Sequence, residues 1–101
     1  MGKKKKQRNS ARKIRILVLD ENASVRRELI QLINHEPGFR VSAEAENANQ
    51  ALDAVDKREV DLAIVDVSME STNGIQLTEK IKARCPNLPV LVLPTSEFLK
   101  M

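Results

Sequence analysis

Residues 62–74, LAIVDVSMESTNG, decide how the fold is interpreted, because four apolar residues lead directly into Asp66 and a short polar stretch then reaches Gly74. With Asp61 before it, the apolar run predicts a strand over residues 61–66 that is buried on both faces. Carboxylates are among the side chains least often fully buried, so the acid that ends this strand needs an explanation. Two interpretations are open: Asp66 is a solvated acid where the strand stops, or it belongs to a site.

The same alternation of apolar strands and amphipathic helices runs along the rest of the chain. We expect strands at residues 14–20, 39–45, 61–66 and 90–93, and helices after residue 22, at 49–58 and at about 73–84. Asn22 or Ser24 is suited to cap the first of these helices. Strands that alternate with helices at this spacing predict right-handed βαβ units around a parallel sheet, which is an α/β fold.

Apolar residues at helical spacing predict which face of each helix packs on the sheet. The expected inward residues are Val25, Leu29, Leu32 and Ile33 in the first helix, Ala51, Leu52 and Val55 in the second, and Leu77, Ile81 and Cys85 in the third. The residues expected on the opposite side of the first helix are Arg26, Arg27, Glu28 and Gln31.

Charge divides the 101-residue chain into two parts. Residues 1–15 hold eight Lys or Arg and no acid, whereas residues 16–101 hold nine Lys or Arg against 14 Asp or Glu, so the net charges are +8 and −5. We expect residues 1–13 to be a basic, disordered tail, either merely solvated or able to hold nucleic acid phosphates or an anionic surface. No apolar run approaches the roughly 20 residues of a membrane span, there is no secretory signal, and Cys85 is the one cysteine, so a cytoplasmic location is expected.

Acidic residues end two of the expected strands. Asp20 and Glu21 follow the first strand, and Asp66 ends the third. If these strands are neighbours, as in a doubly wound order that begins 2-1-3, the three carboxylates converge at one edge of the sheet. Such a cluster repels itself unless it holds a cation, and Mg²⁺ suits oxygen ligands. A carboxylate beside Mg²⁺ can attack phosphorus, but strand-end acids also serve as ordinary helix caps, and the residues alone leave both hypotheses open.

The stretch from about residue 14 to residue 96 resembles the receiver domain of bacterial two-component response regulators. The resemblance is carried by the acidic pair Asp20 and Glu21, by Asp66, by Met69 three residues later and by Gly74 eight residues later. Residues 38–52, GFRVSAEAENANQAL, are most similar to the subgroup that precedes a helix-turn-helix output domain. The resemblance implies a flavodoxin-like sheet over residues 14–101 that is truncated after the fourth strand, with strand order 2-1-3-4 and three to four helices.

The resemblance also assigns roles to residues. It implies that Asp66 is phosphorylated and that Asp20, Glu21 and Asp66 hold Mg²⁺ with the backbone carbonyl of Ser68. Thr95 serves as the switch hydroxyl if the loop bends to bring it into the position that the family gives to a Thr or Ser. The phosphoryl group would come from the phosphohistidine of a sensor kinase that docks on the first helix. The expected function is therefore phosphorelay signalling by a phospho-acceptor that is not itself an enzyme.

Some positions depart from the family pattern and define an alternative. Glu21 and Glu70 replace the usual Asp and Pro, Pro94 occupies the slot of the switch hydroxyl one residue before Thr95, and the sequence stops at Met101 before the strand that bears the usual Lys. The alternative is a receiver-like interaction module that phosphorylation does not switch, in which the bare sheet edge or the basic tail binds a partner, and the bare edge or face can also pair with a second copy of the chain. Binding of DNA is a third hypothesis.

Overall fold

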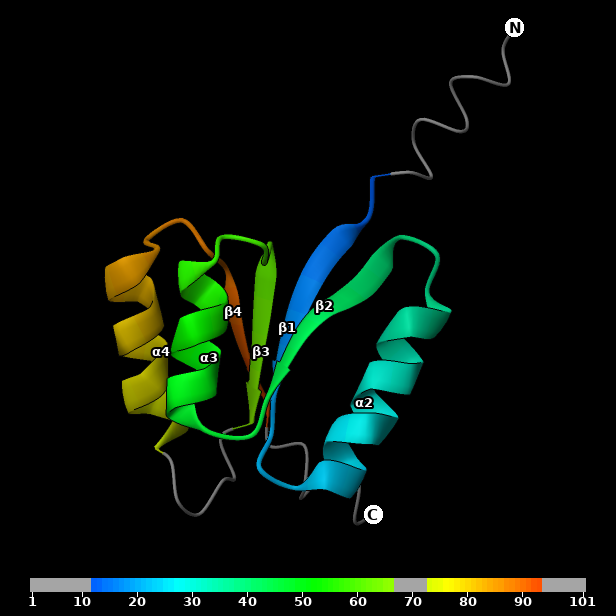
Figure 1. Cartoon of the computed structure of the whole chain (residues 1–101), viewed down its shortest axis with the longest axis horizontal. Coiled ribbons are helices and arrows are strands. Elements are labelled where there is room, and N and C mark those ends of the chain that lie inside the picture. The colour runs from blue at the N-terminus through cyan, green and yellow to red at the C-terminus, as the bar shows by residue number, and fades with distance from the viewer. Residues whose placement is uncertain (1–11, 67–72, 94–101) are drawn as a thin grey trace, which may run out of the picture.

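The computed structural model describes residues 12–66 and 73–93, which form a parallel sheet with helices on both of its faces (Figure 1). The elements are β1 (Ile14–Leu19), α2 (Ala23–His35), β2 (Phe39–Ala45), α3 (Ala48–Asp56), β3 (Leu62–Asp66), α4 (Gly74–Arg84) and β4 (Val90–Leu93). The four strands lie in the order β2-β1-β3-β4, all parallel. The α/β class, the 2-1-3-4 order and the receiver-type arrangement predicted from the sequence are confirmed.

Strand β1 lies in the interior of the sheet, between β2 and β3, and its last four residues are buried. Ile16 to Leu19 are at most 1% exposed, because α2 covers one face of the sheet and α3 and α4 cover the other (Figure 1). Leu17 and Leu19 pack toward Leu77 and Ile81 of α4, as the helical spacing of these residues predicted. Burial on both faces explains why the strand has no polar residue between Ile16 and Leu19.

The packing face of α2 differs from the prediction in two residues. Leu32 is 63% exposed, and Ile30 packs with Leu29 and Ile33 against the sheet in its place. Successive residues turn by about 100° around a helix, so a stripe centred between Leu29 and Ile30 leaves Leu32 well to one side. Arg26, predicted on the outer side, is instead largely buried, with 14% of its side chain exposed. The prediction for these two residues was wrong because helical spacing fixes the width of a stripe better than its centre.

Each helix begins just after an asparagine. The side-chain oxygens of Asn22, Asn47 and Asn73 accept hydrogen bonds from backbone N–H groups in the first turns of α2, α3 and α4, at 2.9–3.0 Å. Of the two caps considered for the first helix, Asn22 is therefore correct. The capped starts of α2 and α3 fix where the chain leaves β1 and β2. Across the described ranges, no helix is both long and apolar enough to cross a lipid bilayer.

Candidate functional site

The ends of β1 and β3 bring two of the predicted acids to the same edge of the sheet. The two strands are paired in parallel from Ile16 with Leu62 to Leu19 with Val65. Asp20 directly follows Leu19, and Asp66 directly follows Val65, so the two acids come after paired residues of neighbouring strands. Figure 1 shows this carboxyl-terminal edge of the sheet at the bottom of the view. The expected adjacency of the first and third strands is confirmed.

Both acids are buried. Asp20 is 1% exposed and Asp66 is 2% exposed, and within the described part of the chain they are the only buried polar or charged residues. The interpretation of Asp66 as a solvated acid is therefore wrong. Nor is Asp66 the cap of the helix that follows, because Asn73 caps α4. Buried acids at the carboxyl end of a parallel sheet lie where ligands of such sheets bind, so Asp20 and Asp66 form the candidate site.

The main chain around Asp20 is held by three hydrogen bonds. Its backbone N–H donates to the carbonyl of Ala45 at 3.1 Å, and its own carbonyl accepts from Nη1 of Arg26 at 2.7 Å. Its Oδ1 accepts from the backbone N–H of Asn22 at 2.9 Å, which closes a tight turn into α2. Asp20 is thus tied to β2 and to α2, so its carboxylate is fixed in direction before any ligand binds.

Arg26 is a positioning residue that the sequence pattern did not identify. Its guanidinium bridges the carbonyl of Asp20 and, at 2.9 Å, Oε1 of Glu44 on β2. These contacts cross from α2 to two strands, and a contact with a main-chain carbonyl leaves no periodic signal in the sequence. The available signal was an arginine one turn into a helix that directly follows an acidic pair.

The donor chemistry at this edge fits Mg²⁺. Carboxylate oxygens are the ligands that Mg²⁺ takes from proteins, in small number, with water completing the shell. In the part of the chain that the structure describes, no three side chains of His, Cys, Asp or Glu gather as a metal site. Glu21 is half-buried in the turn that leads into α2, and the predicted convergence of Glu21 with Asp20 and Asp66 is not seen among the described residues. Two carboxylates with water remain sufficient for Mg²⁺.

Two of the predicted site residues lie outside the part of the chain that the structure describes. Ser68, expected to offer a carbonyl to the metal, and Thr95, expected as the switch hydroxyl, lie outside the described residues, as do Glu70 and Pro94. Their roles stay predictions. The same is true of the proposed basic tail up to residue 11.

Comparison with known proteins adds to this geometry. The family described as "Response regulator receiver domain" matches residues 16–100. The transcriptional regulatory protein DegU of Brevibacillus brevis is 32% identical over 81 residues, which is 80% of this chain and 34% of DegU. A protein-glutamate methylesterase/protein-glutamine glutaminase of Pyrococcus abyssi is 34% identical over 84 residues, which is 83% of this chain and 23% of that protein.

Solved structures give the same match. A two-component response regulator of the LuxR family from an Aurantimonas species superposes with a TM-score of 0.74 at 28% identity, over 79% of this chain and 57% of that one. The chain thus spans 34% and 23% of the lengths of the two curated relatives and 57% of the length of the chain in the solved structure. These proteins have different names but share the stretch that matches this chain. The similarity therefore concerns this stretch and not the remainder of each protein.

Proposed function

The chain belongs to the family of response regulator receiver domains, and from this premise we propose that Asp66 accepts a phosphoryl group from the phosphohistidine of a sensor histidine kinase. One observation carries the proposal: Asp20 and Asp66 are buried at equivalent ends of adjacent strands. A buried acid at the carboxyl end of a parallel sheet stands where ligands of such sheets bind. The proposed role is that of a phospho-acceptor in the cytoplasm, not of an enzyme.

The proposed transfer uses the carboxylate of Asp66 as nucleophile. One of its oxygens attacks the phosphorus, the P–N bond of the phosphohistidine breaks, and the bonding pair stays on the imidazole nitrogen, which takes up a proton from solvent. Asp20 and Asp66 are the residues that would hold Mg²⁺, and the ion would neutralise charge on the phosphoryl oxygens. Arg26 and Asn22 serve the reaction by fixing Asp20 before the ion arrives.

A small phosphodonor tests the proposal without the kinase. The chain is incubated with acetyl phosphate and Mg²⁺, and the adduct is detected by intact mass and by its stability in acid and loss in base. Asp66→Asn is compared with Asp53→Asn, an exposed aspartate on α3 that serves as the matched control. We expect one adduct on the wild type and on Asp53→Asn, and none on Asp66→Asn.

The control variants also define what would contradict the proposal. Thermal melting first shows that Asp66→Asn is folded. An adduct of equal amount on all three proteins would place the phosphoryl group elsewhere, and no adduct on any of them would remove the phospho-acceptor function.

The alternative function is an interaction module that phosphorylation does not switch. The observation that favours it is Leu91, an exposed apolar residue on β4, which pairs only with β3 among the described strands. An exposed apolar strand at a sheet edge is a surface on which another chain can add. Absence of labelling together with dimerisation that Leu91→Lys abolishes, measured by sedimentation, would select this alternative.

A further inference from the structure

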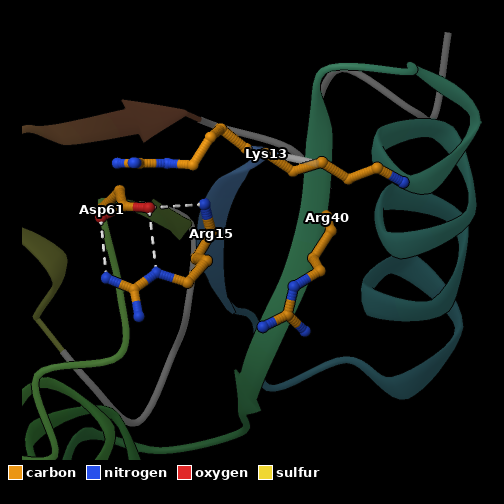
Figure 2. Close-up of a pocket in the computed structure, with 5 residues that line it drawn as sticks. Lys13, Arg15, Arg40 and Asp61 are labelled. Atoms are coloured by element: carbon orange, nitrogen blue, oxygen red, sulfur yellow. Dashed lines mark hydrogen bonds and ion pairs between the residues drawn. The ribbon is translucent and has the colours of Figure 1, made fainter. Parts of the chain in front are cut away.

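The amino-terminal edge of the sheet, opposite the two buried acids, carries a strongly basic pocket. The pocket measures about 450 Å³ and is lined by Arg12, Lys13, Arg15, Arg40 and Asp61 (Figure 2). These residues come from the start of β1, the start of β2 and the residue before β3. They meet because β1 pairs with β2 in the register that sets Arg15 beside Arg40. Four cations and one carboxylate therefore surround a single hollow.

The carboxylate is committed to one of these cations. Asp61 Oδ2 accepts hydrogen bonds from the backbone N–H and Nε of Arg15, at 2.8 and 3.1 Å, and Oδ1 accepts from Nη2 at 3.0 Å. The side-chain and then the backbone hydrogen bonds from Arg15 lower the pKa of Asp61 to about 2, and the charge of Arg12 adds to this. Asp61 thus stays ionised at neutral pH and neutralises Arg15. Among the lining residues, Arg12, Lys13 and Arg40 are left as an excess of positive charge.

The exposed apolar residues Ile14 and Phe39 come one position before Arg15 and Arg40 and lie on the other face of the sheet, where Ile16 and Val41 pack. They do not line the pocket, so its binding chemistry comes from its cations. Two of the three excess cations are arginines, and arginine pairs with phosphate oxygens in a two-pronged geometry that lysine lacks.

We propose that the pocket lined by Arg12, Lys13 and Arg40 binds single-stranded nucleic acid. The three cations hold the phosphates of its backbone. A flexible single strand can lead its phosphates into a concave pocket, whereas a lipid surface is flat and meets convex basic surfaces. The sequence adds further positive charge before the pocket residues, because Lys3 to Lys6 and Arg8 precede Arg12 along the chain.

The test measures binding of the full chain to a labelled oligouridylate of about twelve nucleotides by fluorescence anisotropy. Arg40→Gln should weaken binding and reduce the slope of log affinity against log salt by about 0.7, the value for one lost phosphate contact with a single strand. Phe39→Leu should change the affinity less than about twofold and leave the salt slope unchanged, because Phe39 lies on the other face of β2 and does not line the pocket.

Matched variants separate a site from net charge. Arg27→Gln on α2 and Lys80→Gln on α4 each remove one exposed charge from a residue that does not line the pocket. Each should change the affinity less than about twofold. Equal weakening by Arg27→Gln and Arg40→Gln would overturn the proposal. It would also be overturned if replacing Lys3 to Lys6 by Gln abolished binding while Arg40→Gln had no effect.

A lipid arm completes the test. Vesicles of phosphatidylcholine with phosphatidylserine are offered to the same variants in a flotation assay. Tighter binding to vesicles than to the oligonucleotide, with the same sensitivity to Arg40→Gln, would replace the nucleic acid by a membrane surface and contradict the proposal.

Discussion

The two edges of this one sheet hold their carboxylates in opposite ways. At the amino-terminal edge, Asp61 is exposed and bonded to Arg15, in a pocket where positive charge is in excess. At the carboxyl-terminal edge, Asp20 and Asp66 are both buried on adjacent strands. The comparison teaches that one sheet can hold an exposed acid in an ion pair with a single arginine at one edge and bury two acids at the ends of adjacent strands at the other.

The largest expected effect comes from the strand that joins the two edges. Leu17 is fully buried at the centre of β1, and Leu17→Ala should lower the free energy of unfolding by about 2–5 kcal/mol through the lost burial and the cavity. Urea denaturation measures the change. Leu32→Ala, at the exposed position on α2, is the matched control and should cost less than about 0.5 kcal/mol. Equal losses would show that the packing of α2 described above is wrong.

Magnesium should stabilise one edge and not the other. At a concentration about 100 times its dissociation constant, Mg²⁺ should raise the free energy of unfolding by about 2.7 kcal/mol, because it binds the folded chain. Asp20→Asn should abolish this increment, and Asp61→Asn should keep it. Urea denaturation with and without Mg²⁺ provides the comparison, and an increment that survives Asp20→Asn but not Asp61→Asn would reverse the assignment of the edges.

The smallest expected effect is the acid dependence of the Asp61 pair. The ordinary pKa of the group is 3.8 and the folded value is about 2, so the unfolded chain binds the proton more readily. The stabilisation is therefore complete above about pH 4 and is lost as the pH falls from there through about 2. Because the pair is exposed, its contribution is less than about 1 kcal/mol.

A pH series of thermal melts on the wild type and Asp61→Asn checks this. The difference between the two proteins should be largest near neutral pH and should shrink below about pH 4. A difference that grows as the solution is made more acidic would contradict the sign of the pKa shift.

Sequence patterns predicted the sheet well because β1, β3 and β4 are short apolar runs, and β1 and β3 lead directly into an acid. The boundaries of β2 and β4 agree with the structure at both ends, and the neighbouring positions of β1 and β3 followed from the topology expected of βαβ units. Asp20 and Asp66 could be predicted for the same reason, since each is the first polar residue after a buried run.

The parts that sequence reasoning missed depend on contacts between segments far apart in the chain. Arg26 is half-buried because it reaches the carbonyl of Asp20 and the side chain of Glu44, and neither contact has a sequence period. The basic residues at the start of the chain indicated a tail, but Arg40 joins Arg12 and Lys13 only through the register of β1 with β2. Register between parallel strands is set by packing on both faces, which a single sequence does not encode locally.

The central claim is that Asp20 and Asp66 bind one divalent ion between the ends of β1 and β3. Mn²⁺, which takes the same oxygen ligands as Mg²⁺, broadens the NMR signals of nearby amides and so maps its own position. The account predicts that substoichiometric Mn²⁺ broadens the amides of Asp20, Glu21 and Asp66, that excess Mg²⁺ restores them, and that Ile14 and Phe39 at the opposite edge stay sharp. Broadening centred on Asp61 at that opposite edge, or no selective broadening, would contradict it.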